Sequence, residues 1–239
     1  MGGPGWPILG GPWAVSRSRR PHSDLRRQVS PILPIAVKCQ VNTPPLNSDT
    51  VAIAFTNFLY FMAKNPTIYR KLQRLIEAEF PGGPSEWTYE KAKRIRYIDH
   101  LIHETLRLRP PVPMGFPRQT PPEGLQIDEV YIPGDVIVNV STWAIQQDER
   151  YFDSAAEFIP ERWETISPES AAYLPFQRGP FACVGKALAM MQLRMLISCV
   201  ALRYNIAFAP GEDGVAFWEE AKETLTLWLP ALNLVFSPR

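Results

Sequence analysis

The sequence predicts a mainly α-helical α+β fold, in which long buried helices are combined with small β-sheet elements. The 239-residue chain is 46% hydrophobic, which is enough to bury a substantial core. Residues 47–65 and 186–204 have the length and apolar content of buried helices. Short apolar stretches on either side of Pro133-Gly134-Asp135 are typical of small strands joined by a turn.

The first 46 residues differ in composition from the rest of the chain. They are rich in Gly, Pro, Ser and Arg and have no sustained hydrophobic period, so we expect loop or disorder there. Residues 47–65 have polar capping residues, an apolar body and a stop at Asn65-Pro66, which predicts a buried helix. Pro66 then opens an amphipathic helix that extends to about Phe80.

The later elements are shorter until the last long helix. Residues 97–109 predict a helix with its apolar residues on one side, and residues 142–148 predict a short helical segment. A long helix should begin at Lys186 and end near Tyr204. Residues 224–230 and 232–238 are expected to pair as a closing hairpin.

Composition excludes several classes of protein. The 25 basic and 24 acidic residues nearly cancel, which gives no bulk field that would favour nucleic acid. Three cysteines in a chain of this length do not make a disulfide framework, so we expect a reducing compartment or at least a fold that is indifferent to oxidation. The sequence contains no run of about 18 apolar residues and no secretory signal pattern, so it predicts no membrane span.

A cysteine marks the start of the last long helix. Cys183 follows Gly179 and precedes Gly185, and strong helix-forming residues begin at Lys186. The unpaired N–H groups and the dipole of a helix N-terminus favour negative charge, and this shifts a nearby thiol toward thiolate. A thiolate serves as a nucleophile or as a metal ligand, and the loop alone leaves both open.

Two further motifs carry charge. Glu104 and Arg107 lie three residues apart and therefore on one helix face, where they can form a charge-assisted pair. Arg162 follows in the stretch IPERWE.

Taken together, these motifs resemble the cytochrome P450 family of haem-thiolate monooxygenases, and their general look is similar to that of fungal members. The motifs are E-x-x-R at Glu104 and Arg107, P-E-R-W at 160–163, and F-x-x-G-x-x-x-C-x-G from Phe176 to Gly185. The resemblance covers residues 47–239, which correspond to about the second half of a family member. It therefore implies a truncated chain, and the first 46 residues resemble nothing in the family.

The resemblance implies a role for particular residues. Cys183 would be the axial thiolate ligand of the iron of haem b, with Phe176 beside the sulfur and Gly179 and Gly185 permitting close approach of the backbone. A buried ion triad would fix the architecture under the cofactor, and its members would be Glu104, Arg107 and Arg162.

The resemblance also implies roles for three further residues, and two positions depart from the family pattern. Arg118 would meet a haem propionate, and Asp49 and Thr50 would relay protons during oxygen activation. The Ala-Gly pair that the family has before this segment is replaced by Leu46-Asn47. Two residues before the cysteine, Phe181 stands where many members have a basic residue.

The implied reaction inserts one oxygen atom of O2 into a small organic substrate, with electrons from NADPH delivered by a partner NADPH-cytochrome reductase. Arg178 and Lys186 flank the cysteine and could contribute to the docking face for that reductase. Family members of this kind are usually anchored to the endoplasmic reticulum membrane, so membrane association would require an N-terminal anchor that this sequence lacks. The segments that would define the substrate are mostly missing.

Two alternatives remain open. Cys183 could instead act with His100 and His103 as a thiol enzyme or zinc site, although no zinc-ligand spacing is met. A non-catalytic fragment that keeps the motifs without binding haem productively fits them equally. Cys199 is expected to be a small core residue, and Cys39 lies in the unmatched leader.

Overall fold

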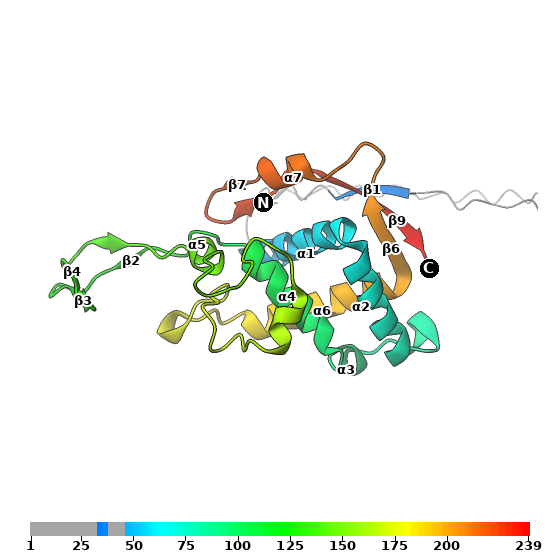
Figure 1. The fold of residues 1–239 in the computed structure, drawn as a ribbon, viewed down its shortest axis with the longest axis horizontal. Helices are drawn as coiled ribbons and strands as arrows, with labels where there is room; N and C mark the ends of the chain where they lie inside the picture. The colour runs from blue at the N-terminus through cyan, green and yellow to red at the C-terminus, as the bar shows by residue number, and fades with distance from the viewer. Residues whose placement is uncertain (1–32, 38–45) are drawn as a thin grey trace, which may run out of the picture. The chain divides into compact units, whose positions relative to one another are not determined.

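The protein is described by a computed structural model, in which residues 33–37 and 46–239 are described, with side chains from residue 49 onward. All of these residues belong to one unit of the chain (Figure 1). The unit combines helices with small antiparallel sheets, which confirms the predicted α+β class.

Long helices make up most of the regular structure. They are α1 (Leu46–Lys64), α2 (Pro66–Glu79), α4 (Arg96–Leu108) and α6 (Lys186–Arg203). Their bounds agree with the predicted helices to within one or two residues at each end. Shorter helical segments lie between them: η1 (Gly83–Glu86), α3 (Tyr89–Ala92), α5 (Thr142–Gln146), η2 (Pro160–Glu164), η3 (Gly179–Phe181) and α7 (Val215–Glu219).

The largest sheet has the strand order β1-β9-β6, all antiparallel. Its strands are β1 (Leu33–Val37), β6 (Tyr204–Phe208) and β9 (Leu232–Pro238). The sequence predicted no regular structure before residue 47, whereas five of those residues form β1 along one edge of β9. The rest of that leader, including Cys39, lies outside the described residues.

The predicted closing hairpin is wrong. Strand β8 (Leu227–Trp228) pairs with β7 (Lys222–Glu223), whereas β9 pairs with β1 and β6. The link between β8 and β9 contains Pro230 but none of the Gly, Asn or Asp residues that close a tight hairpin. Strand β9 instead buries Leu232 and Leu234 in the core beside β6.

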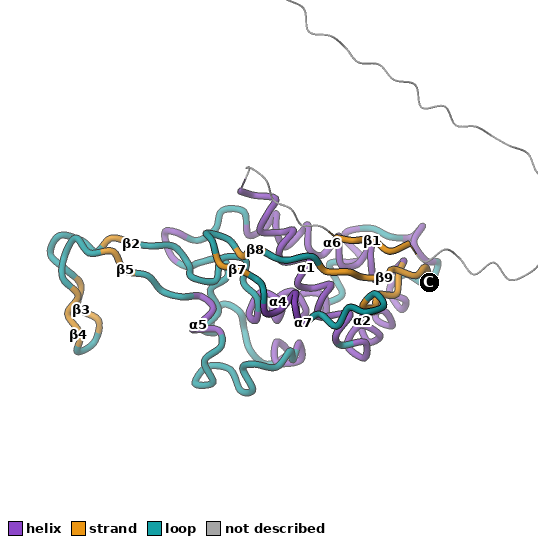
Figure 2. Tube along the Cα trace, turned by 90° about the horizontal axis from the view of Figure 1, so that it is seen from above, coloured by secondary structure: helices purple, strands orange, loops and turns teal. Residues whose placement is uncertain are grey.

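The strands in the middle of the chain form a ribbon. Strand β2 (Arg118–Gln119) pairs with β5 (Ile137–Val138), and β3 (Leu125–Ile127) pairs with β4 (Val130–Ile132). Strands β4 and β5 flank Pro133-Gly134-Asp135 as predicted, but each pairs with an earlier strand. The β3–β4 hairpin lies at the far end of the ribbon made by β2 and β5 (Figure 2).

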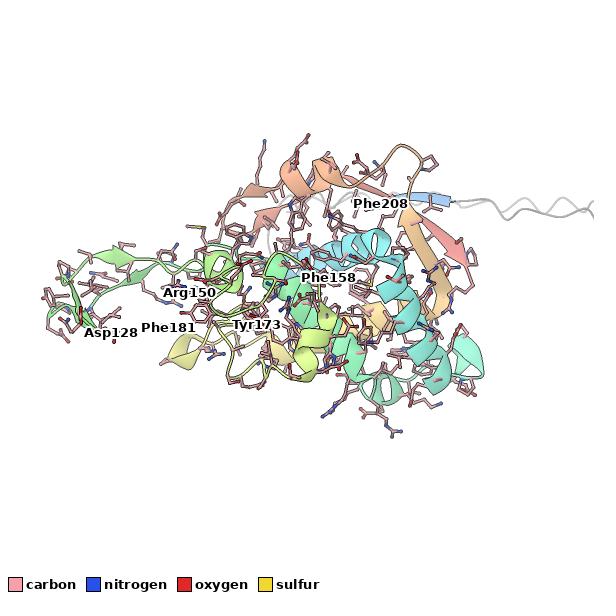
Figure 3. The ribbon with its side chains drawn as sticks, in the orientation of Figure 1. Asp128, Arg150, Phe158, Tyr173, Phe181 and Phe208 are labelled. Atoms are coloured by element: carbon pink, nitrogen blue, oxygen red, sulfur yellow. The ribbon has the colours of Figure 1, made fainter. Side chains whose placement is uncertain are left out.

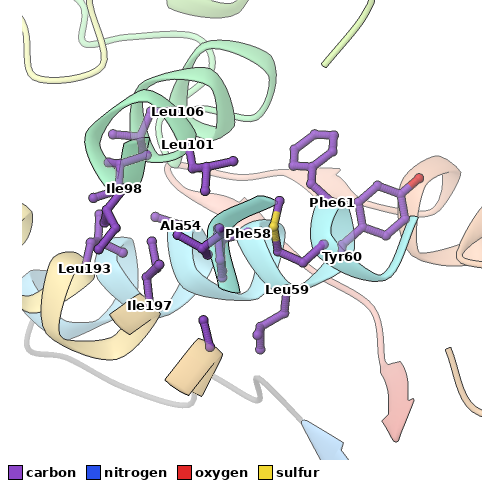
Figure 4. Close-up of a cluster of buried hydrophobic side chains, with 14 of the residues drawn as sticks. Ala54, Phe58, Leu59, Tyr60, Phe61, Ile98, Leu101, Leu106, Leu193 and Ile197 are labelled. Atoms are coloured by element: carbon purple, nitrogen blue, oxygen red, sulfur yellow. The ribbon is translucent and has the colours of Figure 1, made fainter. Parts of the chain in front are cut away.

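Helix α1 lies at the centre of the core and contacts α2, α4, α6 and β6. It is apolar on nearly every side, and Phe58 and Met62 are almost completely buried. Figure 4 shows Leu101 and Ile98 of α4, with Leu193 and Ile197 of α6, packed around it. This packing holds α4, which carries Glu104 and Arg107 of the charged cluster, and the middle of α6, the helix that follows the cysteine loop.

Candidate functional site

The carboxylate of Glu104 is the centre of a buried polar cluster. Its side chain has no exposed surface. Oε1 accepts hydrogen bonds from Arg107 Nη2 (2.8 Å), Arg162 Nε (3.0 Å) and the Ile159 backbone N–H (2.9 Å). Oε2 accepts from Arg107 Nε (3.0 Å) and from the indole N–H of Trp163 (2.9 Å). The carboxylate therefore joins α4 to η2, which is distant in sequence.

The guanidinium of Arg107 is also fully buried, and all of its N–H groups are used. Nε and Nη2 form a bidentate pair with Glu104. Nη1 donates to the backbone carbonyls of Gln146 (2.8 Å) and Ala155 (2.7 Å), and Nη2 also donates to that of Glu157 (3.0 Å). One side chain of α4 thus holds carbonyls at three separate positions, one at the end of α5 and two in the loop that follows it.

Arg162 completes the cluster. Its side chain is 6% exposed, and its Nη1 and Nη2 donate to the backbone carbonyls of Asp153 (2.8 Å) and Ser154 (3.3 Å). One carboxylate against two guanidinium groups leaves the cluster with one positive charge in excess. Backbone carbonyl groups bonded to the two arginines surround this charge with the negative ends of their dipoles. Removing one partner of such a buried ionic group leaves a desolvated charge, which costs about 3–5 kcal/mol.

The cysteine loop is closed by its backbone. The Cys183 N–H donates to the Phe176 carbonyl at 2.7 Å, across the turn that contains η3. Gly179 has φ +68°, a conformation that L side chains rarely adopt. Gly185 is the N-cap of α6, so Cys183 lies just before the helix N-terminus, where the spacing predicted it. A Cβ added at Gly185 would lie 3.7 Å from the Cys183 Sγ.

The surface around the cysteine is apolar and exposed. The Cys183 side chain is exposed, as are Phe181 (64%) and Val184 (102%). Arg118 of β2 reaches this loop, with its guanidinium carbon 4.2 Å from the centroid of the Phe181 ring. Figure 3 shows Phe181 on this loop. Phe176 is partly buried against the core, so it does not by itself shield the thiol.

Asp49 lies in the first turn of α1 and Thr50 follows it directly, and both are half-buried. The structure places them on a different element from those that carry the ion cluster and the cysteine loop. Their relation to the cysteine stays a prediction.

An aromatic group beside the ion cluster was not anticipated. His103 Nδ1 lies 3.0 Å from the Tyr173 hydroxyl, and the Tyr173 ring packs edge-on against Trp163 at 4.8 Å. Burial lowers the pKa of His103 to about 4, so its imidazole is neutral at pH 7. The motif PERW contained Trp163, but nothing in the sequence linked that indole to Glu104 or to Tyr173.

The zinc alternative finds no support. Within residues 33–37 and 46–239, no group of three or more His, Cys, Asp or Glu side chains is arranged to hold a metal ion. Burial is also the main influence on His100 and lowers its pKa. No helix of the described part of the chain is long and apolar enough to cross a membrane.

Comparison with known proteins gives consistent results. The family model described as Cytochrome P450 matches residues 47–230. A Phoma sp. protein named Cytochrome P450 monooxygenase eupD is 72% identical over 192 residues, which cover 80% of this chain and 67% of that protein. Cytochrome P450 monooxygenase orf5 from Eupenicillium brefeldianum is 39% identical over 195 residues, which are 39% of its length.

A solved structure also matches. The crystal structure of a cytochrome P450 (CYP102L1) superimposes with a TM-score of 0.69 at 28% identity, and the match covers 80% of this chain and 43% of that one. The chain therefore spans between about two fifths and two thirds of the length of these matched proteins.

Proposed function

Because this chain belongs to the cytochrome P450 family, we propose that it carries the haem-binding half of a monooxygenase that inserts one oxygen atom of O2 into a small organic substrate, a hydroxylation-type reaction. The observation that supports this most directly is the exposed Cys183 on a closed loop before α6. The ion cluster of Glu104, Arg107 and Arg162 lies in the same unit.

The residues present fit haem b. A planar macrocycle needs an axial ligand, an apolar surface against its face and a cation for its propionates. Cys183 offers the thiolate, and Phe181 and Val184 offer exposed apolar surface on both sides of it. Arg118, beside Phe181, offers a guanidinium suited to a carboxylate. When bound, the haem would supply the activation of oxygen.

The chain's own residues would hold and orient that group. Cys183 would bind the iron through its sulfur, and the hydrogen bond from its N–H to the Phe176 carbonyl keeps the loop closed. Gly179 provides the backbone conformation of the turn, and Gly185 leaves space beside the sulfur. The side chain of Phe176 packs next to the loop on the core side.

The ion cluster would act at a distance from the reacting atoms. Glu104 fixes η2 against α4 through Arg162 and Trp163, and Arg107 fixes the end of α5 and the loop that leads from it to η2. We assign Asp49 and Thr50 to proton delivery, because an acid and an alcohol in adjacent positions can relay protons. Their half-buried position in α1 is compatible with that role.

Electrons would come from NADPH through a reductase. The exposed Arg178 and Lys186 flank the cysteine loop and could contribute cationic surface to that docking. Arg178 also donates to the carbonyls of Pro168 and Ala171, which gives it a structural task. We propose an endoplasmic reticulum location only for a form of the protein that carries a membrane anchor.

The test is to reconstitute the purified chain with haem, reduce it and add carbon monoxide. We expect a red-shifted Soret band typical of a thiolate ligand, and we expect Cys183→Ser to abolish it. Cys199→Ser is the matched control, because Cys199 lies within α6 away from the loop. If wild-type chain gives no such band, the non-catalytic alternative is favoured. An unchanged band in Cys183→Ser would refute the assignment of the ligand.

A further inference from the structure

Gln146, the last residue of α5, is completely buried and uses both ends of its amide. Its Nε2 donates to the carbonyls of Leu106 (3.1 Å) and Arg107 (3.0 Å), at the end of α4. Its Oε1 accepts from the Leu174 backbone N–H at 2.8 Å. One side chain therefore joins the helix that carries the ion cluster to the segment that leads into the cysteine loop.

The bond to α4 is reciprocal. The last carbonyls of a helix have no partner within the helix, and Gln146 satisfies two of them. In return, Arg107 Nη1 donates to the main-chain carbonyl of Gln146 at 2.8 Å. Both the backbone and the side chain of Gln146 are thus bonded to α4, so its amide has little freedom to move.

From Leu174, backbone hydrogen bonds continue to the backbone N–H of Cys183. The Leu174 carbonyl accepts from Gln177 N–H at 3.0 Å, and Gln177 has φ +58°, which turns the chain sharply. Within this turn lies Phe176, whose carbonyl accepts the Cys183 N–H at 2.7 Å. The position of Leu174 therefore determines where this turn begins and, through it, where the cysteine backbone lies.

We propose that Gln146 is a positioning residue for the cysteine loop. It holds the loop in a fixed position relative to α4 and the ion cluster. This inference rests on the proposed role of Cys183 for its functional meaning, but the positioning itself can be measured without haem. An amide suits the task because it donates to carbonyls at one end and accepts from an N–H at the other. A leucine of similar size would do neither, and it would remove this partner from the buried carbonyls of Leu106 and Arg107 and from the partly buried N–H of Leu174.

The experiment is amide-resolved hydrogen exchange on the haem-free 239-residue chain. In Gln146→Leu, we expect the amides of Leu174 and Cys183 to exchange about tenfold faster or more, because each lost buried bond lowers local stability. Gln147→Leu is the matched control. Gln147 is the next residue and donates to the Leu108 carbonyl at 3.3 Å, but it has no hydrogen bond to Leu174. We expect that variant to leave both amides near their wild-type rates.

Each result decides the question. Equal exchange at Leu174 and Cys183 in wild type and Gln146→Leu would refute the proposal, and so would equal acceleration in both variants. If Gln146→Leu does not fold, the wild-type chain still tests the bond. Leu174 must then be protected as strongly as Cys183, and exchange as fast as an exposed loop amide would overturn the proposal.

Haem reconstitution separates this inference from the proposed function. If the proposed function and the positioning role of Gln146 are both correct, haem-reconstituted Gln146→Leu should show a smaller fraction of the thiolate-type band than Gln147→Leu. Failure of wild-type chain to give that band would count against the proposed function, while the exchange result would still stand. A full thiolate-type band in Gln146→Leu, together with unchanged exchange, would refute the positioning role alone.

Discussion

At the scale of single residues, Glu104 is the centre of the ion cluster, because its one carboxylate pairs with two buried guanidinium groups. Its two oxygens accept hydrogen bonds from three side chains and one backbone N–H. An isosteric amide would preserve the shape of the site and remove the charge. The effect of that change measures the contribution of the charge and of the hydrogen bonds that the second oxygen accepts, apart from packing.

We predict that Glu104→Gln lowers the free energy of unfolding by about 3–5 kcal/mol, since Arg107 and Arg162 would become uncompensated buried charges. Urea unfolding followed by circular dichroism measures the change. The control is Glu86→Gln, which removes an exposed ion pair with Lys91 at 3.6 Å and should cost less than about 1 kcal/mol. Similar losses in both variants would contradict the predicted contribution of the buried carboxylate to stability.

The imidazole of His103 predicts a pH dependence. Its pKa falls from the ordinary 6.5 to about 4 on folding because of burial, so the unfolded chain binds its proton more tightly. Stability contributed by the neutral ring is complete above pH 6.5 and is lost as the pH falls toward 4. The His100 pKa is lowered too and adds to the same trend. Melting temperatures measured from pH 7 to pH 4 should decline less steeply in His103→Gln than in wild type, and parallel curves would contradict this.

At the scale of elements, the cysteine loop depends on one unusual backbone conformation. Gly179 has φ +68°, and a Cβ built there meets no atom within 4 Å. The requirement for glycine is therefore conformational and not a matter of space. This distinction can be tested, because residues differ in their tolerance of the left-handed region.

We predict that Gly179→Ala destabilises the chain by about 1–2 kcal/mol, which is the cost of the left-handed conformation for an L residue. Gly179→Asn should lose less, since Asn visits that region more readily. Differential scanning calorimetry of both variants measures the difference. Equal losses would point to a steric cause at this position.

The sequence predicted helices better than it predicted strand pairing. Proline, capping residues and apolar period mark the helix ends locally, as at Asn65-Pro66. Strand partners depend on distant edges, so β9 was assigned to the wrong neighbour and β1 was missed. The motifs identified Glu104, Arg107 and Arg162, but Gln146 carried no signal, because its partners are backbone groups of other segments.

At the scale of the whole molecule, the chain covers only part of the length of its relatives but contains both the ion cluster and the cysteine loop. Exposed apolar side chains remain around the thiol, where Phe181 and Val184 face outward. A ligand that covers them should stabilise the folded chain through mass action.

We predict that haem raises the melting temperature of the wild-type chain, with a stabilisation of about 2.7 kcal/mol at a hundredfold excess over the dissociation constant. Cys183→Ser should lose most of this shift, whereas Cys199→Ser should keep it. Thermal scans with and without haem make the comparison. An equal shift in all three proteins would indicate adsorption to apolar surface without thiolate ligation.

The bond between Glu104 and Arg162 joins residues 58 positions apart in the chain. Bringing together residues so far apart in the chain costs conformational entropy, and the bond can form only after that cost has been met. The pair should therefore form after the local helices during folding. Its energy would then be largely absent from the transition state. Loss of the carboxylate should accelerate unfolding and leave refolding nearly unchanged, so the cluster acts mainly as a kinetic barrier that prolongs the lifetime of the native state.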